Sequence, residues 1–214
     1  MSSTQVCRTD GLDENYQKLA SLLASLGRAC LNGRAVSKIE MSFYGKLHDF
    51  SKWLIAPIVA GLCPEFDAFQ GPDEALKFLS ERGIGAVNRE VDDSKHYGES
   101  ITLDFLSGSV NVSIRGTIAE GRLMVSRIDL FDRIYLDPTG DNLFVEYNDE
   151  PGVLGKIAGI LGFENINITD IRAPQDLKNN RSLAVIKTNK PVPPDVVAKI
   201  SSGVKAVNAF TFEF

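Results

Sequence analysis

The stretch Asp149-Glu-Pro-Gly-Val-Leu-Gly-Lys-Ile-Ala-Gly-Ile-Leu-Gly162 decides how the C-terminal part of this 214-residue chain folds. Its apolar residues recur at three- and four-residue spacing, which predicts a helix from Pro151 to Phe163 with the proline in the first helical position. Residues 143–148, just before it, alternate apolar and polar side chains, which predicts a half-buried strand. A strand therefore passes directly into a helix at Asp149.

The same patterns continue to the C-terminus. Strands are expected over 167–172 and 182–188, followed by a helix from Pro193 to Ser202 and a last strand with Phe210, Phe212 and Phe214 on one face. Residues 142–214 are thus predicted to run strand, helix, strand, strand, helix, strand. That order is typical of a ferredoxin-like domain.

Residues 14–138 are predicted to form another domain. Helices are expected over about 16–30, 49–62 and 72–82, and Pro57 should kink the second helix or begin a new one. Alternating residues predict strands over 39–43, 101–105, 110–114 and 123–125. We therefore expect an α+β fold with helices on a mostly antiparallel sheet. The turn-rich segment 137–142 marks the domain boundary, and residues 1–13 are expected to be a flexible segment.

Composition limits the class of partner. The chain has 23 basic and 28 acidic residues, a net charge of −5, with the basic residues scattered, which argues against a nucleic-acid or membrane partner. No apolar stretch approaches the ~20 residues of a membrane-spanning helix. The segment Met1–Asn15 is polar and resembles no secretion signal, so we expect a cytoplasmic protein.

Sequence motifs for catalysis or metal binding are absent. The chain contains no GxGxxG, GxxxxGK[ST], HExxH or GxSxG string. His48 and His96 are its only histidines, and Cys7, Cys30 and Cys63 are widely spaced, which suggests surface histidines and reduced thiols. We therefore predict no catalytic and no metal-ligating residue.

The start of the predicted helix at Pro151 is a candidate binding site. The free backbone N–H groups of Gly152, Val153 and Leu154 should point out of the helix N-terminus, which attracts a carboxylate. Gly152, Gly155, Gly159 and Gly162 lie at helical spacing, so another backbone can come close on that face. Tight packing on the domain's own sheet is the alternative use of these glycines.

These residues carry a family resemblance. Tyr147-Asn-Asp-Glu-Pro-Gly-Val-Leu-Gly155, with Leu161-Gly162 and Asn165-Ile-Asn-Ile168, resembles the ACT domain of D-3-phosphoglycerate dehydrogenase. Upstream, Ile39-Glu-Met-Ser-Phe-Tyr-Gly45 and Val112-Ser-Ile-Arg-Gly-Thr-Ile118 resemble the intervening, or allosteric substrate-binding, domain of the long-form enzymes. The resemblance covers residues 14–214 and leaves out the family's catalytic NAD-binding and substrate domains.

The resemblance implies a ligand site for L-serine or a similar small amino acid between paired ACT domains, and hence a homodimer or a tetramer. The matching positions are Tyr147, Asp149 and Asn167. Asp149 can pair with the ammonium, Asn167 can donate and accept hydrogen bonds, and the amides after Pro151 can hold the carboxylate. The alternatives are a helix N-cap for Asp149, a core aromatic for Tyr147 and a turn residue for Asn167.

Three departures from the family pattern concern the ligands. Around Phe66-Asp-Ala-Phe-Gln-Gly71 the family's usual Val-Asn…Val-Asn-Ala pattern is absent. Asp137 replaces an arginine with which some members bind a substrate-like anion, so Arg115, Arg122 and Arg127 are either substitute anion ligands or solvated strand charges. The polar hairpin 174–181 replaces a glycine-rich link, which allows a different effector.

The resemblance favours the regulatory, amino-acid-binding and oligomerisation region of a D-3-phosphoglycerate dehydrogenase-like protein. We expect no activity from this chain alone and no cofactor in it, since NAD belongs to the family's missing catalytic part. One alternative is a component like the β-subunit of L-serine dehydratase, although its Ser-Ser-Ser-His-Thr stretch is absent. The other is an ACT module that only dimerises, because the exposed edges of a small sheet favour pairing.

Overall fold

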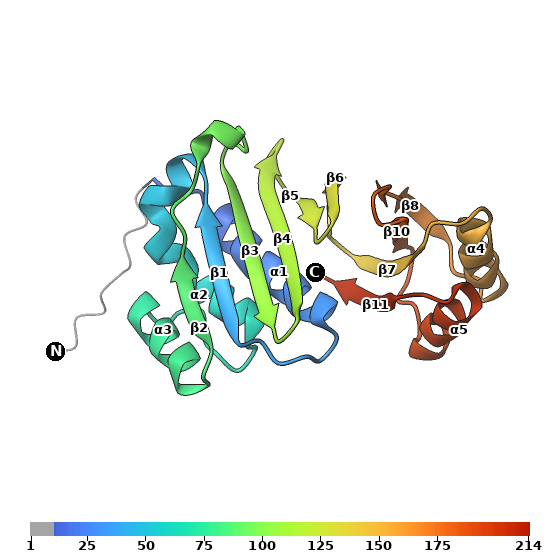
Figure 1. Cartoon of the computed structure of the whole chain (residues 1–214), viewed down its shortest axis with the longest axis horizontal. Helices are drawn as coiled ribbons and strands as arrows, with labels where there is room; N and C mark the ends of the chain where they lie inside the picture. The colour runs from blue at the N-terminus through green and yellow to red at the C-terminus, as the bar shows by residue number, and fades with distance from the viewer. Residues whose placement is uncertain (1–10) are drawn as a thin grey trace.

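The computed structural model describes residues 11–214. It shows two α+β domains side by side (Figure 1). We call residues 14–136 the first domain and residues 141–213 the second domain. The predicted α+β class is confirmed. Most of the expected flexible segment, residues 1–10, lies outside the described part. Of the remainder, Leu12 is buried in the core, and the Asp13 side chain accepts a hydrogen bond from the Asn15 N–H at the start of the first helix.

The first domain places its helices on one face of a six-stranded sheet, as Figure 1 shows. The helices are α1 (Glu14–Leu31), α2 (Ser51–Leu62) and α3 (Pro72–Glu81), with short 3-10 helices η1 (Gly45–Phe50) and η2 (Asp93–Lys95). The strands are β1 (Lys38–Phe43), β2 (Gly85–Asn88), β3 (Ser100–Ser107), β4 (Val110–Ala119), β5 (Arg122–Ile128) and β6 (Phe131–Leu136). Their order is β2-β1-β3-β4-β5-β6, antiparallel except for β1 with β2.

Three details of the first domain correct the expectation from sequence. Strand β2 was not among the expected strands. Pro57 does not begin a new helix, because α2 runs from Ser51 to Leu62 with the proline inside it. Strand β6 was not expected. Its residues Asp132, Arg133 and Tyr135 interrupt the apolar pattern, and Arg133 and Tyr135 have positive φ angles of 58° and 47°. Pairing with β5, and not local alternation, makes this segment a strand.

Glycines allow the helices of the first domain to approach their neighbours closely. A Cβ atom on Gly61 of α2 would lie 2.1 Å from the Ser21 carbonyl oxygen of α1, and one on Gly27 would lie 2.1 Å from the Phe105 ring. The Ser25 hydroxyl also donates to the Gly61 carbonyl at 3.1 Å. Helices α1 and α2 therefore pack backbone against backbone at Gly61.

The second domain contains β7 (Asp141–Asn148), α4 (Val153–Phe163), β8 (Ile168–Arg172), β9 (Gln175–Asp176), β10 (Arg181–Thr188), α5 (Pro194–Val204) and β11 (Asn208–Glu213). Its main strands are antiparallel neighbours in the order β11-β7-β10-β8, and the short β9 also pairs with β10. Strand residues such as Leu143 and Val145 face α4 and α5, and with Ile157 and Ile200 they form a core of their own.

The other face of the second sheet packs on the first domain. Phe144 and Leu183 belong to the same buried cluster as the α1 and β3 side chains of the first domain, and Phe210 and Phe212 pack against that cluster. The rings of Phe144 and Phe210 are stacked with their centroids 4.9 Å apart. The central strands β7 and β10 are therefore buried on both faces, and the two domains share a hydrophobic interface.

Candidate functional site

Asp149 lies in the loop between β7 and α4, where its carboxylate is held from two sides. Its Oδ1 accepts a hydrogen bond from the Ser182 hydroxyl at 2.8 Å, and its Oδ2 accepts one from Gln175 Nε2 at 3.1 Å. The Asp149 backbone N–H donates to the Asn180 carbonyl at 3.0 Å. A carboxylate has about four acceptor positions, so two remain for another donor such as an ammonium group.

The helix beside Asp149 starts two residues later than expected. Gly152, with φ of 88°, is the N-cap of α4, and Val153 is the first helical residue. Pro151 is therefore not in the first helical position. Because Lys156 N–H makes the first bond back to Gly152, the amides without intrahelical partners are those of Val153, Leu154 and Gly155. No side chain caps this end, so Asp149 is not the N-cap that the alternative required.

Tyr147 is part of the core. Its side chain is 3% exposed and lies in the second domain's buried cluster. It pairs across the sheet with Ser182, whose hydroxyl contacts Asp149. Burial raises the pKa of the Tyr147 hydroxyl, the Ser182 side chain opposes this, and the negative charge of Asp149 adds to it. Tyr147 thus lies next to Ser182, the residue whose hydroxyl holds the Asp149 carboxylate.

Asn167 lies at the other end of the sheet from Asp149 within one protomer. Along β10, Arg181 pairs with Asn148 and Thr188 pairs with Ile168, so the two ends are seven residues apart. At roughly 3.3 Å per residue this is about 23 Å. The Asn167 N–H donates to Asn189 Oδ1 at 2.9 Å, the Asn167 carbonyl accepts from the Asn189 N–H at 3.1 Å, and the Asn167 side chain is exposed. A single protomer therefore does not bring Asn167 to Asp149.

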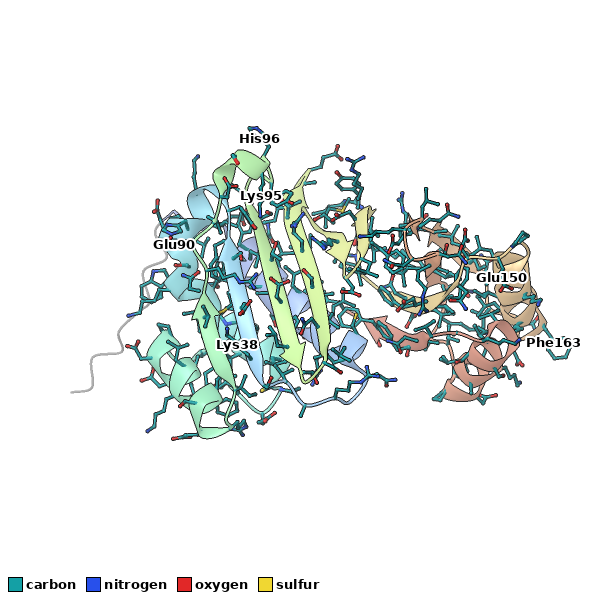
Figure 2. The ribbon with its side chains drawn as sticks, in the orientation of Figure 1. Lys38, Glu90, Lys95, His96, Glu150 and Phe163 are labelled. Carbon is teal, nitrogen blue, oxygen red and sulfur yellow. The ribbon has the colours of Figure 1, made fainter. Side chains whose placement is uncertain are left out.

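The glycines of α4 face outward, which contradicts the alternative of packing on the sheet. Cβ atoms placed on Gly155, Gly159 and Gly162 would meet no atom within 4 Å. A groove of about 470 Å³ between α4 and α5 runs beside them and is lined by Gly159, Ile160 and Phe163, among others. Figure 2 shows Phe163, 84% exposed, projecting at the end of the molecule away from the first domain. The face is apolar and open to a close neighbour.

The open face of the first sheet carries a polar pocket of about 350 Å³. Arg115 lines it with its side chain only 10% exposed, its guanidinium 3.6 Å from the centre of the Tyr97 ring, and Nε donating to Thr102 at 3.0 Å. Arg133 and the buried Ser100 hydroxyl, which has no hydrogen-bond partner, line it as well. Asp132 also lines the pocket, with its Oδ1 3.9 Å from Arg115 Nη1, so one of the two guanidinium groups that could hold a small anion is already paired with a carboxylate.

The other two arginines considered from the sequence do not line this pocket. Arg127 Nε donates to the Asp129 carbonyl at 2.8 Å, and Arg122 contacts the Asp137 carboxylate at 3.4 Å. The amine of Lys187 donates to the Asp137 carbonyl at 3.0 Å. Hydrogen bonds from Thr139 and the charges of Lys187 and Arg122 lower the pKa of the Asp137 carboxyl against the opposing effect of its burial. Asp137, at the position of the family's arginine, therefore forms an ion pair with Arg122 of the first domain at the protein surface.

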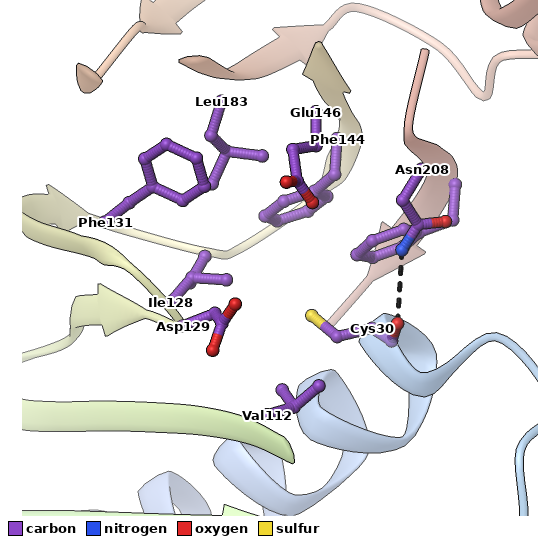
Figure 3. Close-up of a pocket in the computed structure, with 10 residues that line it drawn as sticks. Cys30, Val112, Ile128, Asp129, Phe131, Phe144, Glu146, Leu183 and Asn208 are labelled. Atoms are coloured by element: carbon purple, nitrogen blue, oxygen red, sulfur yellow. Dashed lines mark hydrogen bonds between the residues drawn. The ribbon is translucent and has the colours of Figure 1, made fainter. Parts of the chain in front are cut away.

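A small cavity of about 60 Å³ lies at the interface between the domains (Figure 3). Asp129 reaches it from the first domain and Glu146 from the second, while Asn208 Nδ2 donates to the Cys30 carbonyl at 3.1 Å. Burial raises the pKa of both carboxyls, and Asp129 raises that of Glu146 further; Arg127 and Arg181 oppose these shifts. Burial also raises the pKa of the Cys30 thiol, which leaves it unreactive. The cavity has room for a few water molecules.

Two other kinds of site were searched for among residues 11–214. No three His, Cys, Asp or Glu side chains in that range are grouped so that they could hold a metal ion. None of its helices combines the length and the apolar character needed to cross a bilayer.

The sequence missed the residues that hold Asp149. Ser182 was visible only as the start of a predicted strand, and Gln175 only as part of a polar hairpin. They lie 33 and 26 residues from Asp149 in the chain. No local spacing connects such residues, since the pairing of β10 with β7 and β9 brings them together.

Among known proteins, the chain is similar to enzymes named D-3-phosphoglycerate dehydrogenase. It is 23% identical over 205 residues to the Synechocystis sp. enzyme, covering 92% of this chain and 36% of that protein. It is 25% identical over 195 residues to the Methanocaldococcus jannaschii enzyme, covering 86% and 35%, and 29% identical over 135 residues to the Mycobacterium leprae enzyme, covering 62% and 25%. No family model matches the chain.

The expected relationship to D-3-phosphoglycerate dehydrogenases is confirmed at this level. The chain spans about a third or less of the length of these relatives, between 25% and 36%. The matched regions cover 62% to 92% of this chain.

Proposed function

We propose that this chain is the regulatory, amino-acid-binding and oligomerisation region of a D-3-phosphoglycerate dehydrogenase-like protein in serine biosynthesis, and that it binds L-serine or a similar small amino acid. The observation that carries the proposal is the Asp149 carboxylate, held by Ser182 and Gln175 beside the uncapped start of α4. The carboxylate suits an ammonium group, and the free amides of Val153, Leu154 and Gly155 suit a carboxylate. An α-amino acid carries both groups on one carbon.

The topology of the second domain supports an ACT domain over residues 142–214. Numbered in chain order without the two-residue β9, its strands lie as fourth, first, third and second in an antiparallel sheet, with both helices against one face. This strand order supports the ferredoxin-like arrangement that the sequence predicts. On the same proposal, residues 14–138 correspond to the intervening, or allosteric substrate-binding, domain.

A complete site requires two copies of the chain. Asn167 lies about 23 Å from the Asp149 end of its own sheet, so it can reach the ligand only from a partner. The outward glycines of α4 allow close approach by such a partner, and β8 has an unpaired edge among the described strands. We therefore infer a homodimer with two identical sites, from which a tetramer can be built.

We do not propose dehydrogenase activity for this chain, although its relatives are named as dehydrogenases. Its sequence has no glycine-rich dinucleotide loop, so we place NAD in the catalytic part of the related enzymes and expect no turnover by these residues. A cytoplasmic location is part of the proposal because serine biosynthesis needs no secreted component.

The test is isothermal titration calorimetry of the purified chain with L-serine, and with glycine, L-alanine and L-valine as comparisons. We expect saturable serine binding near one ligand per chain. Asp149→Ala should weaken it at least tenfold, which is about 1.4 kcal/mol. Asp195→Ala, an exposed carboxylate in the first turn of α5, is the matched control and should leave the affinity unchanged.

Unchanged serine affinity in Asp149→Ala would reject this site. If wild-type protein bound none of the four amino acids yet remained a dimer, the dimerisation-only alternative would replace the proposal. The dehydratase alternative is not favoured, because the relatives named above are all dehydrogenases.

A further inference from the structure

Gln175 is the side chain from the hairpin 174–181 that contacts the Asp149 carboxylate. We propose that Gln175 determines the ligand selectivity of this site by hydrogen bonding to the polar side chain of the bound amino acid. The inference rests on the proposed function, since it assumes that the ligand's ammonium group binds Asp149. It adds the class of ligand side chain that the site prefers, namely one with a neutral hydroxyl.

The backbone fixes the position of Gln175. It pairs with Ser182 where β9 meets β10, and the adjacent Pro174 carbonyl accepts a hydrogen bond from the Leu183 N–H at 3.1 Å. The tip of the hairpin is ordered by Asp176, whose carboxylate accepts hydrogen bonds from the Lys178 N–H and the Asn179 side chain. The hairpin therefore presents the Gln175 amide to Asp149 with little freedom in the main chain.

The Gln175 amide has hydrogen-bonding capacity left over. A primary amide has two N–H donors and one carbonyl acceptor. One donor bonds Asp149 Oδ2 at 3.1 Å, and no other side-chain hydrogen bond of Gln175 occurs among the described residues. In serine the ammonium and the hydroxyl are on adjacent carbons. An amide bonded to the carboxylate that takes the ammonium is therefore within reach of the hydroxyl.

The charges nearby favour a neutral ligand side chain. Arg181, the basic residue at the base of the hairpin, lies 3.7 Å from Glu146, and Arg172 at the end of β8 contacts Asp170 at 3.3 Å. The groups that bond the Asp149 side chain, Gln175 and Ser182, are both neutral. Both of these arginines are ion-paired and both groups that bond Asp149 are neutral, so a hydroxyl is the group that the Gln175 amide distinguishes from a methyl.

The test compares L-serine and L-alanine, which differ by this hydroxyl, on the full chain by calorimetry. Gln175→Met keeps the length of the side chain and removes its hydrogen bonds. We expect the ratio of serine to alanine affinity to fall about three- to tenfold in Gln175→Met, the worth of one hydrogen bond. Lys178→Met introduces the same residue on the same hairpin at a side chain that is not among the described groups bonding Asp149, and should leave the ratio as in wild type.

The outcomes separate this inference from the proposed function. If Asp149→Ala abolishes binding but Gln175→Met keeps the wild-type ratio, the selectivity role is wrong and the site stands. If Gln175→Met weakens serine and alanine equally, Gln175 only positions Asp149 and the selectivity role is wrong. If wild-type protein binds neither amino acid, both proposals fail. Circular dichroism and thermal unfolding of each variant confirm that the hairpin change leaves the fold intact.

Discussion

Replacing Gly159 by alanine should stabilise the single chain and weaken its dimer. Gly159 is near the middle of α4 and exposed, and a Cβ atom there would meet nothing within 4 Å. Alanine is about 1 kcal/mol better than glycine inside a helix. For a chain of this size that corresponds to a rise of about 2–4 °C in the melting temperature, measured by thermal unfolding at a dilution where the monomer dominates.

The same methyl group should cost energy in the dimer. If a partner's backbone packs on the α4 glycines, an added methyl group overpacks the contact by roughly 1–3 kcal/mol. A twofold axis repeats each change, so the dimer loses about 2–6 kcal/mol, or at least about 30-fold in dissociation constant. Sedimentation velocity across a dilution series measures this. Ser80→Ala, at an exposed position of α3, is the control and should not change association.

The test is strict because one substitution must raise the melting temperature of the monomer and also weaken the dimer. A higher melting temperature with unchanged dimerisation would show that the glycine face of α4 is not the interface, and the two-copy site would need another geometry. A lower melting temperature of the monomer would show that the face is covered within the chain, against the open surface described above.

Two further predictions concern stability. Gly61→Ala should lower the free energy of unfolding by about 1–3 kcal/mol and the melting temperature by about 2–12 °C. The reason is that the new Cβ would lie 2.1 Å from the Ser21 carbonyl oxygen and push α1 away from α2. An unchanged melting temperature would contradict this packing. Burial raises the pKa of the Asp129 and Glu146 carboxyls, so the folded state binds protons at these two groups more tightly than the unfolded state. The contribution of the two carboxyls to the free energy of unfolding therefore falls as pH rises above about 4 through their folded pKa values. Asp129→Asn should therefore flatten this part of the urea-unfolding stability profile and stabilise the protein at neutral pH, and an identical slope in the variant would refute the assignment.

The interface between the domains gives a ligand at Asp149 a physical route to the first domain. Asp149 follows β7 directly, and β7 residues Phe144 and Glu146 face the first domain on the opposite side of the sheet from α4. A shift of β7 on ligand binding would therefore move buried contacts, since packed interiors transmit strain.

Local patterns predicted most elements and missed those without a pattern. The strand predicted from the alternation of residues 143–148 and the helix predicted from the three- and four-residue spacing of α4 are both present in the structure. Both patterns arise because these elements bury side chains in the core of the second domain. The start of α4 was wrong by two residues, since Gly152 adopts a left-handed conformation that a glycine permits but spacing does not reveal. Strand β6 was missed because its polar residues are held by pairing with β5.

The sequence by itself determined the α+β class, the order of the main elements of the second domain, and the carboxylate and glycines at the start of α4. It could do so because burial imposes a period of 3.6 residues on helices and of 2 on strands. Only the tertiary structure decided that Ser182 and Gln175 hold Asp149, that Asn167 lies at the far end of the sheet, and that the α4 glycines face outward. These features depend on which strands pair and in which register. The pairing of β10 with β7 and β9 brings together residues 26 to 33 positions apart, and no local repeat in the sequence records that pairing.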